Sequence, residues 1–185
     1  TISLSGSQHC ADSDGRVWYL APDHALRTWD GQQTNSIPTS PLLDGQTLTV
    51  LTADLKGNIW VGTDQGLFEW QTNHCEPMTP TNGEPSINVR SIVPSGAGIL
   101  WVESNGRMRR CSARQWLAES EGWNREMKGV SLRFLHGDTE GGLWSGAGDL
   151  GLVHVLEDGT FHRLTTRAGL PSDTVHFAFQ DRDGN

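Results

Sequence analysis

Residues 54–70 read DLKGNIWVGTDQGLFEW, and this stretch decides the fold because its first part recurs along the chain. The recurring pattern is Asp-x-x-Gly-x-aliphatic-Trp. It returns as DSDGRVW at 12–18, as DTEGGLW at 138–144 and, with Ser in place of Asp, as SGAGILW at 95–101. The four tryptophans of these copies are 42, 41 and 43 residues apart. One structural unit of about 42 residues therefore repeats along the chain.

The composition and the spacing of apolar residues indicate an all-β repeat. The 185 residues include 22 glycines and 8 tryptophans, and only 19% of them are charged, against about 25% in an average soluble domain. Apolar residues alternate with period two between turns rich in Gly, Asp and Asn, which argues against helical repeats of similar length. A repeat of about 42 residues with four short strands is typical of a β-propeller blade.

We therefore predict a single all-β propeller domain over residues 1–185. Four blades and the first strand of a fifth are expected, which leaves open a small closed ring or a fragment of a larger propeller. An open arrangement would expose apolar blade faces, through which the chain could self-associate. The predicted blades are 1–45, 46–86, 87–127 and 128–172, followed by a partial fifth at 173–185.

The repeated residues are predicted to build the scaffold. The Asp of each unit caps the turn between the first two strands, and the Gly adopts a positive φ there. The Trp fills the gap between neighbouring blades. Gly62 and Gly66 are expected to let the second and third strands of their blade bend past one another. The structural positions are Gly15, Gly57, Gly98, Gly141, Trp18, Trp60, Trp101 and Trp144.

The candidate ligand-binding residues lie where the units differ. Eleven residues before the Trp stand Ser7, Thr49, Arg90 and Arg133, and His176 precedes the expected fifth Trp by the same spacing. This column of the innermost strand is polar in every unit, so its two arginines and the histidine are predicted to surround a pocket for an anionic or hydroxylated ligand. The alternative is that the arginines pair with groups of a neighbouring blade. Loops on the same face add Asp64, Gln65 and Asn105.

The third unit departs most from the repeat. Glu103 stands where the second unit has the Gly of WVGT, and the arginine-rich segment 107–128 does not alternate cleanly as two strands. Since a ligand site is expected where the units differ, this segment is the second candidate location.

No sequence pattern indicates catalysis or a bound cofactor. No catalytic triad, paired acids or phosphate-binding loop is found. His154 and His162 face each other across a predicted hairpin, but without a third ligand nearby an ordinary strand pair is favoured. The DRDGN motif at 181–185 has its Gly at the fourth position, whereas a calcium-binding EF-hand loop needs it at the sixth. We expect no metal, no cofactor and no enzymatic activity in this chain.

Charge and hydropathy limit the partners further. The formal net charge of −8 argues against nucleic acid, and no apolar run reaches the roughly 18 residues of a membrane span. The chain starts at Thr1 and stops within a motif, so we interpret it as a piece of a longer protein that contacts a membrane only through other regions. Cys10, Cys75 and Cys111 are expected as partly buried thiols, with a Cys75–Cys111 bridge left open.

The complete unit resembles the two-component regulator propeller repeat. The resemblance rests on the letters DxxGNIWVGT and DxGLF, and on GLPSDTV before the fifth copy. It implies a periplasmic sensor propeller upstream of a membrane helix and a histidine kinase or diguanylate cyclase, with a small molecule, often a carbohydrate, as the ligand. The match is close at 54–68 and 169–185, fair at 12–18 and 138–152, and weak at 95–106.

We therefore expect a non-enzymatic sensor or ligand-recognition segment of a periplasmic signalling protein. Two alternatives stay open. One is a protein–protein interaction scaffold, because many propellers have that role. The other is a lyase-like enzyme, because streptogramin-type lyases are propellers with similar repeats.

Overall fold

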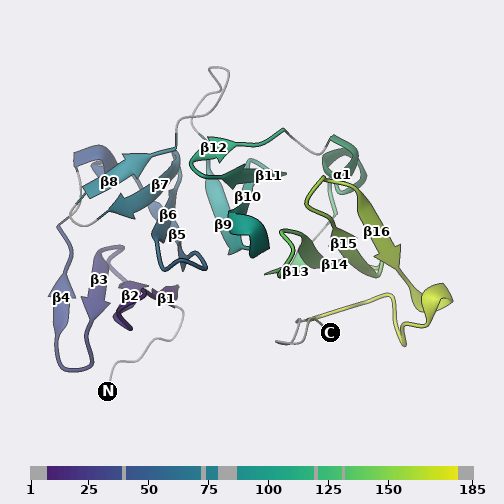
Figure 1. The fold of residues 1–185 in the computed structure, drawn as a ribbon, viewed down its shortest axis with the longest axis horizontal. Helices are drawn as coiled ribbons and strands as arrows, with labels where there is room; N and C mark the ends of the chain where they lie inside the picture. Colours follow the sequence, from purple (N-terminus) through teal and green to yellow (C-terminus); the bar gives the residue numbers. More distant parts are fainter. Residues whose placement is uncertain are drawn as a thin grey trace. The chain divides into compact units, whose positions relative to one another are not determined.

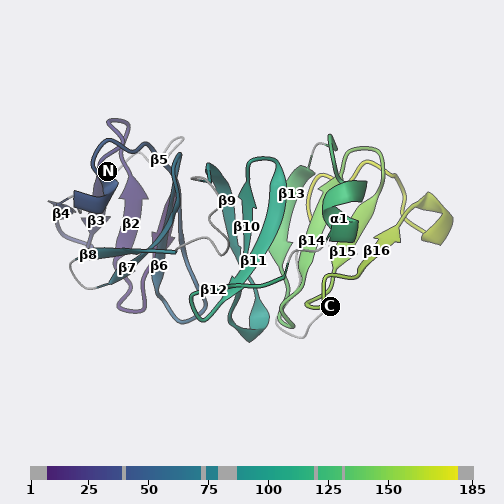
Figure 2. The same cartoon turned by 90° about the horizontal axis from the view of Figure 1, so that it is seen from above.

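The computed structural model describes residues 8–38, 41–71, 74–78, 87–118, 121–130 and 132–178. These residues form four antiparallel sheets of four strands each, with very little helix (Figure 1). Within each sheet the strands are neighbours in chain order, so each sheet is a meander, as the side-by-side strands in Figure 2 also show. The predicted all-β fold of four-stranded propeller blades is confirmed.

The first sheet contains β1 (His9–Ala11), β2 (Val17–Leu20), β3 (Leu26–Trp29) and β4 (Thr34–Ser36). The second contains β5 (Leu48–Ala53), β6 (Ile59–Thr63), β7 (Leu67–Gln71) and β8 (His74–Pro77). The third contains β9 (Val89–Pro94), β10 (Ile99–Ser104), β11 (Arg107–Ser112) and β12 (Gln115–Trp116). The fourth contains β13 (Leu132–Gly137), β14 (Leu143–Ala147), β15 (Leu152–Val155) and β16 (Phe161–Leu164). Three 3-10 turns, η1 (Pro41–Leu43), η2 (Gly96–Gly98) and η3 (Thr166–Ala168), and the helix α1 (Glu121–Glu126) connect the strands.

The chain divides into two compact units, Thr1–Ile92 and Val93–Asn185. The first unit contains the first two sheets. The second contains the fourth sheet and most of the third, because β9 crosses the boundary.

An aspartate closes the turn between the first two strands of the first and second sheets. Asp12 accepts hydrogen bonds from the backbone amides two and four residues further on (3.1 and 2.9 Å) and from the indole N–H of Trp18 (2.8 Å). Asp54 accepts the same three bonds, the last from Trp60 at 3.2 Å. The carboxylate therefore caps the turn, as predicted, and also holds the tryptophan of the next strand.

The glycine of each turn adopts the left-handed conformation that the repeat predicts. Its φ angle is 76° at Gly15, 84° at Gly57, 70° at Gly98 and 100° at Gly141. Residues with a Cβ rarely adopt these values, so glycine closes the turn at the lowest energetic cost.

Tryptophan packs between neighbouring sheets within each unit. The ring centroids of Trp18 and Trp70 are 5.8 Å apart, in a core that the first two sheets share. Trp101 on β10 belongs to a second core that includes Leu143 of the fourth sheet. The predicted packing between blades is confirmed for Trp18 and Trp101.

The third sheet bonds its turn to the fourth sheet without an aspartate. The hydroxyl of Ser95 lies 3.0 Å from the carbonyl oxygen of Asp138 and 2.6 Å from that of Gly142. The indole N–H of Trp101 donates to the carbonyl of Gly141 at 3.0 Å. The loss of the Asp therefore redirects the Trp donor to the turn of the next sheet.

Residues 173–178, the described part of the predicted fifth blade, are not in a strand. They run beside the fourth sheet, where the amide of Gly151 donates to the carbonyl of Asp173 at 2.9 Å and the Thr174 hydroxyl donates to Asp149 at 3.0 Å. The rest of the predicted partial blade, 179–185, lies outside the described residues.

All three cysteines are free thiols, as the predicted partly buried thiols require. Burial raises the pKa of each thiol to about 12, and at Cys10 the Asp12 carboxylate adds to this effect. The thiols are therefore protonated at neutral pH. No helix in the described part of the chain is long and apolar enough to cross a membrane.

Replacing Asp12 by Ala should lower the free energy of unfolding by about 2 kcal/mol, because two amides and one indole N–H lose their acceptor. Urea denaturation at equilibrium measures the change. The matched control is Asp14→Ala in the same turn, since the Asp14 side chain is exposed and bonds to none of the described residues. That variant should stay within about 0.5 kcal/mol of the parent. Equal losses for both variants would show that the Asp12 carboxylate does not hold the turn.

Candidate functional site

A β-bulge on β13 lies at the polar column that the sequence singled out. Leu132 pairs with Ala147 and Phe134 pairs with Gly146, so Arg133 is an extra residue between two regular pairs. Bulges bend a strand and redirect a side chain, and they are common beside functional sites. The predicted ligand residue Arg133 is therefore set apart by the backbone as well as by its charge.

The second sheet carries the same bulge at Thr49 on β5. The Thr49 hydroxyl donates to the carbonyl of Val89 on β9 at 2.5 Å. The Arg133 side chain, in contrast, is exposed and makes no hydrogen bond or ion pair with the described residues. The bulge residue thus makes a structural hydrogen bond in the second sheet, whereas in the fourth sheet it has no bonded partner among the described residues. The alternative, that this arginine pairs with a neighbouring blade, stays a prediction, because most of the predicted fifth blade lies outside the described residues.

A glycine opposite each bulge allows the next segment to approach. A Cβ atom on Gly146 would overlap the carbonyl oxygen of Val175. A Cβ atom on Gly62 would overlap the side chains of Val50 and Val89. The expectation for Gly62 was therefore wrong in its cause, because this glycine makes room for the innermost strands and not for the third strand of its own sheet.

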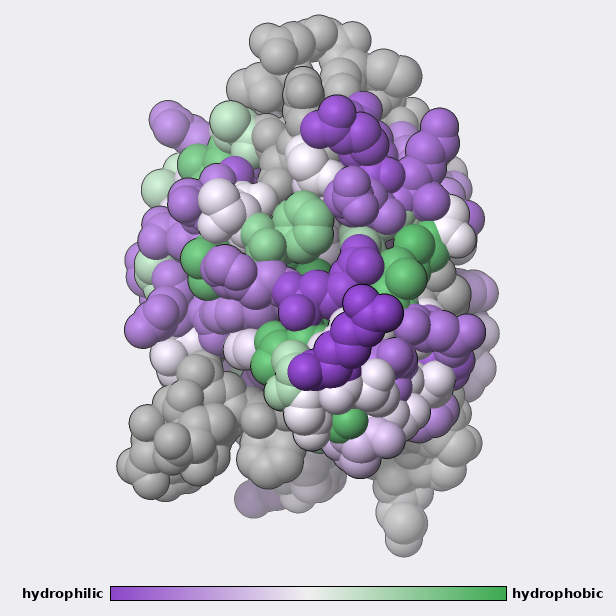
Figure 3. All heavy atoms as spheres, turned by 90° about the vertical axis from the view of Figure 1, so that its right-hand side faces the viewer, coloured by the Kyte–Doolittle hydropathy of each residue, from purple (hydrophilic) through white to green (hydrophobic). Residues whose placement is uncertain are grey.

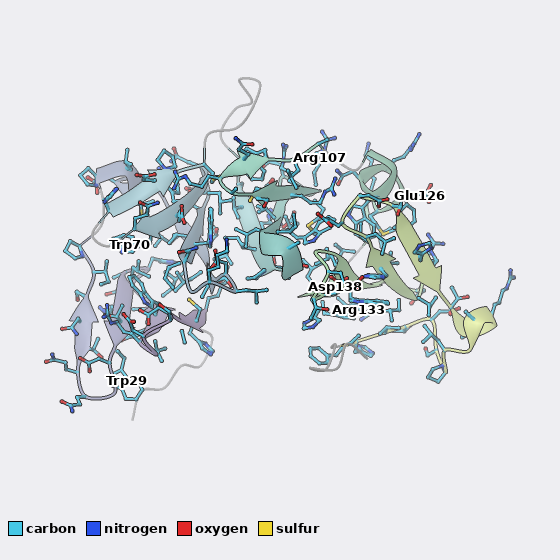
Figure 4. All side chains as sticks on the ribbon, viewed as in Figure 1. Trp29, Trp70, Arg107, Glu126, Arg133 and Asp138 are labelled. Atoms are coloured by element: carbon cyan, nitrogen blue, oxygen red, sulfur yellow. The ribbon has the colours of Figure 1, made fainter. Side chains whose placement is uncertain are left out.

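Arg133 and His176 lie on neighbouring segments of the second unit. The rings of Phe134 and Phe177, the residues that directly follow them, are 5.9 Å apart. His176 is exposed, like Arg133, and bonds to none of the described residues. The contact between the two phenylalanines joins the segments that carry Arg133, which is labelled in Figure 4, and His176, and a shared site for these two residues stays a prediction.

Three other candidates lie in the first unit. Arg90 on β9 is exposed and has no bonded partner in the described part of the chain. Asp64 accepts a hydrogen bond from the amide of Thr47 at 3.0 Å, and its own amide donates to the Thr47 carbonyl at 3.0 Å, so it ties the β6–β7 turn to β5. Gln65 is exposed in the same turn. A common pocket for these residues with Arg133 and His176 stays a prediction.

Asn105 belongs to a different surface. It forms the β10–β11 hairpin turn with Gly106, and their φ angles of 50° and 72° are those of a two-residue turn with positive φ at both positions. Figure 4 shows the nearby Arg107 well separated from Arg133. An open hollow of about 520 Å³ lies here, lined by Asn105, Gly106, Arg107, Asn124, Arg125 and Lys128.

The carboxylate of Asp138 forms a contact that sequence reasoning missed. Its Oδ2 atom lies 2.6 Å from Nε2 of His154, and its Oδ1 atom accepts bonds from the amides of Glu140 (2.8 Å) and Gly142 (2.7 Å). The imidazole stacks on Trp144, with centroids 3.9 Å apart and planes 1° apart. His154 therefore takes the position on the carboxylate that the Trp indole occupies in the first two sheets.

The signal for this contact was present in the strand register. His154 pairs with Trp144 across β14 and β15, and it also pairs with His162 across β15 and β16, as predicted. All four repeat tryptophans were expected in the core. Trp18, Trp60 and Trp101 are buried, but Trp144 is only partly buried, so the prediction is wrong for Trp144.

The Asp138–His154 pair is part of the scaffold. Burial acts to raise the pKa of Asp138, but the hydrogen bonds from His154 and from the amides of Gly142 and Glu140 outweigh it, so the pKa lies below its ordinary value. Both carboxylate oxygens are occupied and one face of the imidazole is covered. Among the described residues, no group of three or more His, Cys, Asp and Glu side chains is placed to hold a metal ion.

Comparisons with known proteins identify the fold but not a family. No protein-family model matches the sequence, and no curated protein matches it. The structure is similar to the extracellular domain of BT4673 from B. thetaiotaomicron, described as a one-component system, with a TM-score of 0.67 and 20% identity over 96% of this chain. It is also similar to the extracellular domain of BT3049, described as a hybrid two-component system, with a TM-score of 0.65 and 18% identity over 96% of the chain.

A streptogramin B lyase is another similar structure, with a TM-score of 0.63 and 14% identity over 97% of this chain. The chain spans 25% of the BT4673 domain, 24% of the BT3049 domain and 60% of the lyase. At these identities the likeness shows the propeller fold alone.

Acidification should test the Asp138 contact. Because the folded-state pKa of Asp138 lies below the value of roughly 3.9 for an unfolded Asp, the carboxylate stabilises the protein above pH 4, and this contribution is lost as the pH falls towards the folded-state pKa. Urea denaturation between pH 5 and pH 3 should therefore show a steeper loss of stability for the parent than for Asp138→Asn. Asp149→Asn, at an exposed position in the same unit, serves as the control. An unchanged pH dependence in Asp138→Asn would contradict this account.

Proposed function

We propose that this chain is a non-enzymatic ligand-recognition segment of a periplasmic signalling protein. The observation that carries the proposal is the position of Arg133. Its guanidinium stands on a β-bulge, is exposed and bonds to none of the described residues, while the equivalent Thr49 is used in a structural hydrogen bond. A scaffold role alone does not require a cation at this position.

Arg133 and His176 suit a small anionic or hydroxylated ligand. A guanidinium presents several N–H donors in one plane and binds carboxylates in a bidentate manner. An imidazole adds a donor or an acceptor for a hydroxyl group. An acidic sugar combines both kinds of acceptor, so we propose a carbohydrate or a related small metabolite as the ligand.

The similar structures support a sensor role by analogy. Two of them are extracellular domains of proteins described as one-component or hybrid two-component systems. This chain corresponds to about a quarter of each of those domains. In this proposal the chain supplies one part of a larger recognition surface, and the output domain lies elsewhere in the protein.

Two alternatives are less well supported. The Asp138–His154 pair resembles a catalytic dyad, but its oxygens are bonded to the turn and its imidazole is stacked on Trp144, which argues against a lyase-like activity. A scaffold for another protein would favour a broad apolar face. The face of the second unit shown in Figure 3 is mostly hydrophilic, with hydrophobic residues in small separate patches.

The proposal predicts that a sugar or small metabolite raises the melting temperature of the full extracytoplasmic region in a thermal-shift screen. Calorimetry with the best ligand should then show at least tenfold weaker binding by Arg133→Ala. The matched control is Arg163→Ala on β16, since Arg163 is also exposed and bonds to none of the described residues. That variant should bind like the parent. Absence of any stabilising ligand, or equal affinity of the Arg133 variant, would overturn the proposal in favour of the scaffold alternative.

A further inference from the structure

The hollow beside the β10–β11 hairpin is built from two elements of the second unit. The hairpin contributes Asn105, Gly106 and Arg107, and α1 with the turn after it contributes Asn124, Arg125 and Lys128. We call these six residues the basic hollow. They include three cations in a chain whose formal net charge is −8.

Helix α1 is fixed to the core of the second unit. Trp123 is only 1% exposed and Met127 is also buried, and both belong to the core shared by the third and fourth sheets. The Trp123 ring meets Phe161 of β16 edge to face, with centroids 6.0 Å apart. Two residues on one side of this short helix therefore hold it in place.

A pair of hydrogen bonds joins the helix to the hairpin. The Asn124 side chain accepts from the amide of Met108 on β11 at 2.9 Å and donates to the carbonyl of the same residue at 3.1 Å. This contact fixes the position of the helix relative to β11. The two walls of the basic hollow are therefore set before any ligand binds, which lowers the entropy lost on binding.

The cations of the helix wall face away from the core. Arg125 lies on α1 and Lys128 in the turn that follows it, whereas Trp123 and Met127 are buried in the core. Both cations are exposed, and neither side chain bonds to a described residue. Arg107 is exposed on the opposite wall.

Glu103 and Glu126 lie within two residues of members of the basic hollow. Glu103 accepts a hydrogen bond from the amide of Gly106 at 3.1 Å, so its carboxylate is engaged with the hairpin backbone. Glu126 neighbours Arg125 in sequence, but Figure 4 shows it well separated from Arg107.

We infer that the basic hollow binds a small polyanion that carries two or more carboxylate or phosphate groups. The Arg125 guanidinium and the Lys128 ammonium group can each meet one oxyanion group. The volume of about 520 Å³ lies in the range of roughly 300–1,000 Å³ that is typical of small-molecule sites. A nucleic acid would need a long basic stripe, and this acidic chain offers three clustered cations.

This inference does not depend on the sensor proposal. The basic hollow and the Arg133 position use different residues, and Figure 4 shows Arg107 apart from Arg133. Loss of one site should therefore leave the other unchanged.

Calorimetric titration of the full chain with citrate and, separately, with inorganic pyrophosphate tests the inference. At least one of the two probes should bind saturably, and the double variant Arg125→Gln, Lys128→Gln should weaken that binding at least tenfold. The relative affinities distinguish a carboxylate ligand from a phosphate ligand. The matched control is Arg163→Gln with Arg167→Gln, two other exposed cations of the second unit, which should bind like the parent.

The melting temperature of each variant shows that it is folded, and Arg107→Gln provides a second test from the opposite wall. Absence of saturable binding of both probes would overturn the inference. Equal loss of affinity in the control variant would also overturn it, because binding would then reflect net charge alone.

Discussion

In the second and fourth sheets, a neighbouring segment approaches the second strand so closely that only glycine fits at one position of that strand. Gly62 and Gly146 occupy this position in the second and fourth sheets, and a Cβ atom on either would overlap the adjacent inner segment. Each glycine pairs with the residue that follows a bulge, at Thr49 or at Arg133. In each of these two sheets one side chain therefore lies outside the regular strand pairing. It is Thr49 in the second sheet and Arg133 in the fourth.

The turn aspartate provides a second constraint, which the sheets satisfy in different ways. A tryptophan indole bonds to Asp12 and Asp54, whereas His154 bonds to Asp138 in the fourth sheet. The third sheet lacks the aspartate and places Arg110 over the Trp101 ring, with its guanidinium donating to carbonyls of the fourth sheet and of the segment after β12. Burial lowers the pKa of Arg110. Arg110 and His154 each pair with the repeat tryptophan of their sheet across the neighbouring strand. These two residues thus make the contacts by which the third and fourth sheets differ from the first two.

The repeat predicts the scaffold well because its signals are local. Each sheet has the four strands that the repeat predicts, and the turn glycines have the predicted positive φ. Helix α1 was not predicted, because the burial of Trp123 depends on packing against the fourth sheet. Local patterns show where units differ, whereas the grouping of those differences into sites requires the tertiary structure.

A scaffold residue and a proposed ligand residue lie at the same bulge in the fourth sheet. Gly146 pairs with Phe134, and Arg133 is the extra residue directly before Phe134. The most direct measurement compares the unfolding free energies of Gly146→Ala and Arg133→Ala in the same urea titration. We predict a loss of about 3 kcal/mol for Gly146→Ala, because the added methyl group has no space, and a change within about 0.5 kcal/mol for Arg133→Ala. A loss of stability in Arg133→Ala as large as that in Gly146→Ala would contradict the account, since Arg133 would then belong to the scaffold.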